Sequence, residues 1–118
     1  MSRIALLAAL PVLIACSASE ETSFPLRFQG HWTDDLAACG GEDTRGIVIT
    51  SDHLDYYDGK GRLLSLDHIS DDAAQAEIAF EGEGEKWRET VKLSLKGDGR
   101  SIEAFMLGQN STLQRCES

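Results

Sequence analysis

Basic residues are scarce in this sequence. Its 118 residues include 11 Lys and Arg against 20 Asp and Glu, which gives a formal net charge of -9 at pH 7. Loss of an amino-terminal segment carrying Arg3 would remove one positive charge and change the net charge from -9 to about -10. Because like charges repel, nucleic-acid backbones and anionic lipid surfaces would repel the chain as a whole. We therefore expect no nucleic-acid partner, and the length leaves room for one small domain.

Long hydrophobic runs are absent as well. The apolar stretch from Ile4 to Ile14 would measure about 16 Å as a helix, whereas a helix that crosses a bilayer needs roughly 20 residues. This stretch follows the positive charge of Arg3 and precedes the small residue Ala15, an order that is typical of a secretory signal peptide. We predict that residues 1–15 form such a signal and are removed.

The end of this leader carries a four-residue pattern. Leu13, Ile14, Ala15 and Cys16 match the bacterial lipobox at every position, so the chain resembles a bacterial lipoprotein. The resemblance implies that Cys16 receives a diacylglyceryl group, that lipoprotein signal peptidase cuts before it, and that the new amino terminus is acylated, for instance with palmitate. Two or three acyl chains would hold the protein on a membrane permanently. In the alternative, the signal is an ordinary one and Cys16 is a disulfide partner.

The residues after Cys16 predict where the domain sits and where it begins. Ser17 stands where an aspartate would resemble the inner-membrane retention signal, so the resemblance points to the outer membrane of a Gram-negative cell, facing the periplasm. Residues 17–23 are small or polar, and Pro25 closes that segment. We predict a lipidated flexible tether over residues 16–25 and a folded domain over residues 26–118.

Two cysteines remain once Cys16 carries lipid. In an oxidising compartment, Cys39 and Cys116 are expected to form a disulfide that closes most of the domain and contributes roughly 4 kcal/mol to stability. A catalytic role for Cys39 is the alternative. It lacks support, because no C-x-x-C pair and no nearby histidine accompany this cysteine.

A helical period is lacking after the tether, and short alternating runs take its place. In residues 86–95, apolar residues and Glu89 share one face, and a similar run over residues 74–81 is joined to it by the Gly-Glu-Gly segment 82–84, which predicts a hairpin. The other predicted strands cover residues 27–33, 46–50, 53–57, 62–69, 101–107 and 112–116, with turns at 58–61, 96–99 and 108–110. We predict an all-β, up-and-down antiparallel barrel of about eight strands, because closure removes the free edges; a two-sheet β-sandwich is the alternative.

The first predicted strand contains Gly30, His31 and Trp32. This triplet resembles the G-x-W motif of the lipocalin or calycin superfamily, and Arg115 is similar to the arginine that packs across that tryptophan at the closed end of those barrels. In size and in its disulfide, the domain also resembles the small periplasmic metalloprotease inhibitors. The resemblance implies a calycin-like barrel. The alternative is that Trp32 is simply a core residue and Arg115 a surface charge.

Glu89 is the most unusual residue of the predicted core face. A buried carboxylate needs a partner, and Arg115 or His68 are the candidates. In the alternative, Glu89 lies at a strand end or bulge and reaches water. His53 and Tyr57 would lie on one face of their strand and form either a polar binding patch or a solvated face.

Catalytic and metal-binding motifs are missing. The sequence has no G-x-S-x-G, no P-loop, no dinucleotide-binding glycine pattern and no histidine spacing that suits a metal. We expect no cofactor, no metal and no catalytic residue, and a binding role is assigned to Trp32, His53, Tyr57, Glu89 and Arg115. The favoured function is an interaction or inhibitor module for an envelope protein. A carrier of a small apolar ligand is the first alternative, and an enzyme that uses Glu89 with a histidine is the second.

Overall fold

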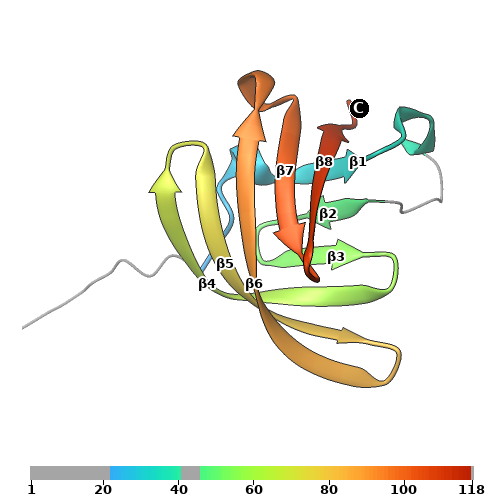
Figure 1. The fold of residues 1–118 in the computed structure, drawn as a ribbon, viewed down its shortest axis with the longest axis vertical. Helices are drawn as coiled ribbons and strands as arrows, with labels where there is room; N and C mark the ends of the chain where they lie inside the picture. The colour runs from blue at the N-terminus through green and yellow to red at the C-terminus, as the bar shows by residue number, and fades with distance from the viewer. Residues whose placement is uncertain (1–21, 41–45, 118) are drawn as a thin grey trace, which may run out of the picture.

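The computed structural model describes residues 22–40 and 46–117 and shows a closed barrel of eight antiparallel strands (Figure 1). The strands are β1 (Gly30–Thr33), β2 (Ile47–Ile49), β3 (His53–Tyr56), β4 (Gly59–Ser70), β5 (Ala73–Gly82), β6 (Glu85–Lys96), β7 (Ser101–Met106) and β8 (Gln109–Arg115). Each strand pairs with the next, and β8 returns to β1. The predicted all-β up-and-down barrel is confirmed, and the two-sheet sandwich does not form.

The predicted signal peptide and the lipidation site Cys16 lie outside the described residues. Within residues 22–40 and 46–117, no helix is both long and apolar enough to cross a membrane. Packing against the barrel begins at Phe24, two residues before the expected boundary: its side chain is only 2% exposed, and its backbone N–H donates to the carbonyl of Ser51 at 2.7 Å.

The first predicted strand is shorter than expected. Residues Leu26–Phe28 form a 3₁₀ turn (η1), in which the N–H of Phe28 donates to the carbonyl of Pro25, and β1 begins only at Gly30. The fixed φ of proline suits the start of such a turn. The turn directs Phe28 into the core, where it is fully buried beside Phe24. The residues that alternation assigned to a strand therefore close one end of the barrel.

The glycines predicted to form the turn at residues 58–61 lie in β4 instead. The β3–β4 turn is Tyr57–Asp58, and both Gly59 and Gly61 are buried strand residues. A Cβ on Gly61 would stand 2.6 Å from side-chain atoms of Ile78 and Phe80. Close packing against β5, rather than a positive φ, is thus the reason for glycine at position 61. The predicted Gly-Glu-Gly hairpin between β5 and β6 is observed, with Glu83 and Gly84 at positive φ.

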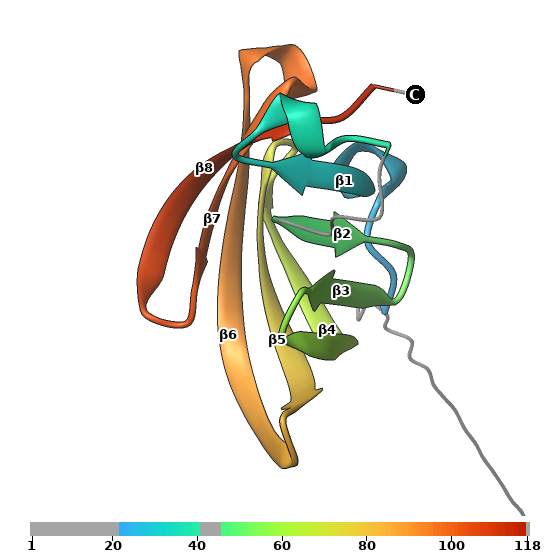
Figure 2. The ribbon, with the colours of Figure 1, turned by 90° about the vertical axis from the view of Figure 1, so that its right-hand side faces the viewer.

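The core is one cluster of apolar side chains that all eight strands supply. Alternate residues of β5 and β6 point into it, and β5 is buried at every second position from Ala74 to Phe80. Trp87 lies at the rim, half-buried, and its ring stacks on Phe80 with centroids 5.6 Å apart. Figure 2 shows β7 and β8 meeting β1 at one end of the barrel and diverging from β2 and β3 toward the other end.

The end where β8 meets β1 is tightly closed. The guanidinium carbon of Arg115 lies 4.2 Å from the centre of the Trp32 ring, and the guanidinium donates to the carbonyls of Gly99, Gln29 and Arg27 at 3.0, 2.8 and 2.7 Å. Trp32 is fully buried, and its indole N–H donates to the Phe28 carbonyl.

Gly30 leaves the space for this stack, since a Cβ there would stand 2.9 Å from Arg115 Nη1. The structure therefore shows the packing of Arg115 across Trp32 that the resemblance to calycins implies. It does not show the alternative, in which Arg115 is a free surface charge.

A disulfide lies just beyond this closure. Cys39 and Cys116 are bonded, with their Cα atoms 5.5 Å apart and 77 residues of separation. The N–H of Cys116 donates to the carbonyl of His31, and this hydrogen bond continues the pairing of β1 with β8 past the end of β8. The disulfide predicted from the cysteine count is present.

Candidate binding cleft

Strand β8 has a free edge over most of its length. It pairs with β7 from Gln109 to Gln114, but β1 pairs only with Gln114 and Arg115. In the described part of the chain, no strand pairs with residues 109–113 on the side that faces β2. The N–H of Arg115 donates to the carbonyl of Arg100, on the side of β8 that faces β7. In an antiparallel strand, the backbone N–H and C=O groups of successive residues point alternately to the two sides. The backbone groups of Asn110 and Thr112 therefore point toward the free edge.

An apolar cleft of about 280 Å³ lies beside this edge. One wall comes from β2 and the end of β3, and the other from the inner side of the β7–β8 hairpin. The side chains that line it are Ile47, Tyr56, Tyr57, Ala104, Met106, Leu107, Gln109, Ser111 and Leu113, with Asp34 and Gly46 at one end. Tyr57 and Leu107 are 74% and 46% exposed, so an aromatic and an aliphatic side chain stand at the rim. A free edge next to an apolar cleft is the arrangement that a docking strand uses.

Glu89 fixes the hairpin that forms one wall of the cleft. Strand β6 runs on past the end of β7, whose last pair with it is Lys92 with Phe105. The N–H of Leu107 therefore has no partner in the β6–β7 ladder, and it donates to the Glu89 carboxylate instead. The Trp87 indole N–H donates to the other carboxylate oxygen at 3.3 Å.

Neither Arg115 nor His68 is the partner of Glu89. Glu89 lies near the end of the β5–β6 hairpin and is half-buried, in line with the alternative that places its carboxylate near a strand end. Its position is explained by its two hydrogen bonds, of which the one from the N–H of Leu107 holds the turn between β7 and β8 in place.

The two tyrosines of the cleft keep their protons well into the alkaline range. Burial, and after it the negative charges of Asp58 and Glu89, raise the pKa of the Tyr56 phenol above its ordinary value. A hydrogen bond to Asp58, and then the charge of the same carboxylate, raise the pKa of Tyr57. The two rings meet edge to face with centroids 6.4 Å apart. At neutral pH both phenols are hydroxyl groups; that of Tyr57 donates to Asp58, and that of Tyr56 can donate to a docked carbonyl.

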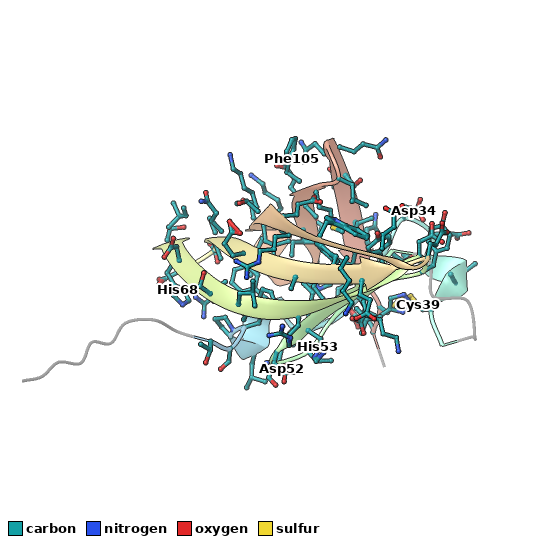
Figure 3. The ribbon with its side chains drawn as sticks, turned by 90° about the horizontal axis from the view of Figure 1, so that it is seen from below. Asp34, Cys39, Asp52, His53, His68 and Phe105 are labelled. Carbon is teal, nitrogen blue, oxygen red and sulfur yellow. A yellow bond between two sulfur atoms is a disulfide. The ribbon has the colours of Figure 1, made fainter. Side chains whose placement is uncertain are left out.

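The residues assigned a binding role fall in three places. Trp32 and Arg115 close the far end of the barrel, and His53 lies on the outer surface, where its Nδ1 atom is 2.9 Å from Asp52 Oδ1 (Figure 3). Only Tyr57 and Glu89 belong to the cleft, at its rim and behind its wall. The expected pairing of His53 with Tyr57 on one face does not form, because β3 ends at Tyr56 and Tyr57 enters the turn.

Sequence reasoning missed the apolar lining of the cleft. Ile47, Met106 and Leu113 lie in predicted strands and were given no role, and they line the cleft because β8 diverges from β2 below the closure. The one local signal was Leu107, an apolar residue directly before the turn glycine Gly108. Both have positive φ, and Leu107 is held outside the core.

The chain has no significant match among protein-family models, curated proteins or solved structures. The closed eight-strand topology and the Arg115–Trp32 stack are consistent with a calycin-like barrel. Among the residues that the structure describes, no three His, Cys, Asp or Glu side chains gather as a metal site.

Proposed function

We propose that this protein is a non-catalytic lipoprotein of the cell envelope, anchored through lipid on Cys16 and facing the periplasm, that acts as an interaction or inhibitor module. The observation that carries the proposal is the free edge of β8 beside an apolar cleft. An extended segment of an envelope protein would add a strand to this edge through the backbone groups of Asn110 and Thr112. Its alternate side chains would enter the cleft against Tyr57 and Leu107.

The packing of the barrel supports a surface function. The interior is filled by a continuous apolar cluster that runs from Phe24 and Trp32 at the closed end to Met106 near the cleft. Such a core matches a barrel whose interior is occupied by its own side chains. Both oxygens of Glu89 accept hydrogen bonds from the chain itself, which favours a structural role for this carboxylate over acid–base catalysis.

The proposed anchor limits where the partner can be. Phe24 is fixed to the β2–β3 turn by its hydrogen bond to Ser51, and it lies eight positions after Cys16 in the sequence. At no more than about 3.6 Å per residue, this tether spans at most about 29 Å. The partner must then present its docking segment close to the membrane surface.

Site-specific photo-cross-linking in cells tests the proposal. A photoreactive side chain at Ser111, which lines the cleft, should trap an envelope protein, and the same group at the exposed residue Lys96 should not. Thr112→Pro removes an N–H that faces the free edge and keeps the β7 ladder, whereas Thr112→Ala keeps that N–H. We expect Thr112→Pro to abolish the Ser111 cross-link and Thr112→Ala to preserve it. Equal cross-linking in both variants, or none in the parent protein, would refute strand docking.

A carrier of a small apolar ligand is the second candidate, because the cleft is lined mainly by apolar side chains. Its volume of about 280 Å³ lies just below the range of typical small-molecule pockets, about 300–1,000 Å³. Native mass spectrometry of a Cys16→Ala variant separates the two functions. A bound lipid-sized mass that disappears in Leu113→Asp would favour the carrier, and a bare protein would favour the interaction module.

A further inference from the structure

Four basic side chains come together on the outer face of the sheet formed by β4, β5 and β6. Across the three strands, Arg62 pairs with Ala79 and Ala79 with Arg88. In the next row Lys60 pairs with Glu81 and Glu81 with Lys86. Together with His53 at the start of β3, these residues line a hollow of about 520 Å³, which we call the basic groove.

The cations of the basic groove have no ion-pair partners. Among the described residues, no carboxylate lies within 4.0 Å of the charged atoms of Lys60, Arg62, Lys86 or Arg88, and their side chains make no hydrogen bond. Four of the nine basic residues in the described ranges thus line one hollow of an acidic protein, and no carboxylate of these ranges forms an ion pair with them. Exposed cations at this density make a local positive potential, even though the net charge of the chain is -9.

The spacing of the two arginines suits one small anion. Arg62 and Arg88 stand on either side of β5, about 10 Å apart at the backbone, because neighbouring strands are about 4.8 Å apart. The residue between them is Ala79, whose methyl group leaves the space above the strand open. Both guanidinium groups can lean over Ala79 and bind the same group of oxygens. Their planar forks match the oxygens of a phosphoryl group.

Nearby carboxylates limit the size of the ligand. Glu81 lies between the two lysines, and Asp55 and Glu77 flank the groove on either side. Asp55 accepts the N–H of Gly61 and Glu77 accepts the hydroxyl of Thr90, so both are occupied locally. Beyond the lysines, toward the β5–β6 turn, the surface carries Asp58, Glu83 and Glu85. An extended polyanion would meet all of these charges, whereas a compact anion seated over Ala79 has only Glu77 and Glu81 as near carboxylates, each two residues away along β5.

We propose that the basic groove binds a phosphoryl group, held by Arg62 and Arg88 over Ala79 and supported by Lys60 and Lys86. The group belongs either to a small free anion or to a phospholipid headgroup. The second source is within reach, because His53 at the edge of the groove is two residues from Ser51, where the segment that leads to the proposed lipid anchor is fixed. The inference is independent of the docking cleft, whose lining shares no residue with the basic groove.

Titration with pyrophosphate tests the site. The full chain, purified in neutral detergent, should bind pyrophosphate with one saturable site in isothermal calorimetry. Arg62→Gln and Arg88→Gln should each weaken binding about tenfold, because each removes one charge-assisted contact. The matched control is the double variant Lys96→Gln/Arg100→Gln, which removes two exposed cations outside the groove.

The control separates a site from general electrostatics. If the control double variant binds like the parent and Arg62→Gln/Arg88→Gln does not bind, while thermal unfolding shows both folded, the site is established. Repeating the titration in phosphatidylcholine vesicles with and without phosphatidylglycerol identifies the source. Weaker pyrophosphate binding in the presence of phosphatidylglycerol assigns the groove to headgroups, and unchanged binding assigns it to free anions. Absence of saturable binding, or an equal loss in both double variants, overturns the proposal.

Discussion

Replacing Arg115 should weaken the barrel more than replacing any exposed cation. Its guanidinium makes three hydrogen bonds to backbone carbonyls and stacks on the ring of Trp32. A hydrogen bond to a charged group contributes about 1.5–3 kcal/mol, and a cation–π contact about 0.5–2 kcal/mol. Because the site is partly exposed, water can replace part of these contacts. We therefore expect Arg115→Gln to lower the free energy of unfolding by about 3 kcal/mol, and Arg115→Lys, which keeps the charge but loses the fork, by about 2 kcal/mol.

Urea unfolding followed by tryptophan fluorescence measures this loss, since Trp32 is fully buried in the folded state. The disulfide must stay oxidised in every sample, so that the unfolded state is the same. Arg100→Gln is the matched control, because Arg100 is exposed and only its backbone is bonded. We expect it to change the free energy of unfolding by no more than about 0.5 kcal/mol. If Arg115→Gln also stays within about 0.5 kcal/mol of the parent, the stack on Trp32 does not hold the barrel closed, and the reasoning fails.

Three further predictions concern the disulfide, the hairpin tip and the tyrosines. The Cys39–Cys116 disulfide closes a loop of 77 residues, so its reduction should lower the free energy of unfolding by about 4.5 kcal/mol. Urea unfolding with and without reductant measures this loss, and no change would mean that the disulfide does not constrain the unfolded chain. Glu89→Leu leaves the N–H of Leu107 without its acceptor and should speed hydrogen exchange at this amide relative to the parent, whereas Glu89→Gln should retain most of the protection. In an absorbance titration, Tyr56 should ionise above pH 10.0, because its pKa is raised in the folded protein. The stability that it contributes is therefore complete below pH 10.0 and is lost as the pH rises through the folded pKa. Because the charge of Glu89 is one cause of the shift, Glu89→Gln should lower that pKa.

The strand order was predictable because each strand pairs with its neighbour in sequence. Alternation alone places the residues of β5 and β6 on their correct faces, and the Glu83–Gly84 turn fixes the register between them. The disulfide was predicted from the cysteine count together with the expectation of an oxidising compartment. These features depend on local pattern or on simple counting, which the sequence displays directly.

The cleft was not predictable, because it depends on where β8 leaves β1. That point is set by the end of β1 at Thr33, because Asp35 caps the 3₁₀ turn Leu36–Ala38 and the chain no longer runs beside β8. The predicted strand over residues 27–33 ends at the same residue, but the predicted strand over residues 112–116 omits residues 109–111, which form most of the free edge. Glu89 was recognised as unusual, yet its partner Leu107 is a backbone donor on a hairpin that ends before β6 does. The types of the side chains do not show which backbone N–H groups lack a partner in the sheet.

Register also explains why the overall charge misrepresents the surface. Taken as an average, a net charge of -9 predicts repulsion of every anion. The pairs Lys60–Arg62 and Lys86–Arg88 each occupy alternate positions, and so each pair lies on one face of its own strand. Because β4 starts at Gly59, directly after the Tyr57–Asp58 turn, it pairs with β5 from this point onward. This pairing aligns Lys60 with Lys86 and Arg62 with Arg88 across β5. With the turn placed at residues 58–61, Lys60 belongs to a loop and the basic groove does not exist. A two-residue difference in one turn therefore decides whether the acidic domain carries a site for an anion.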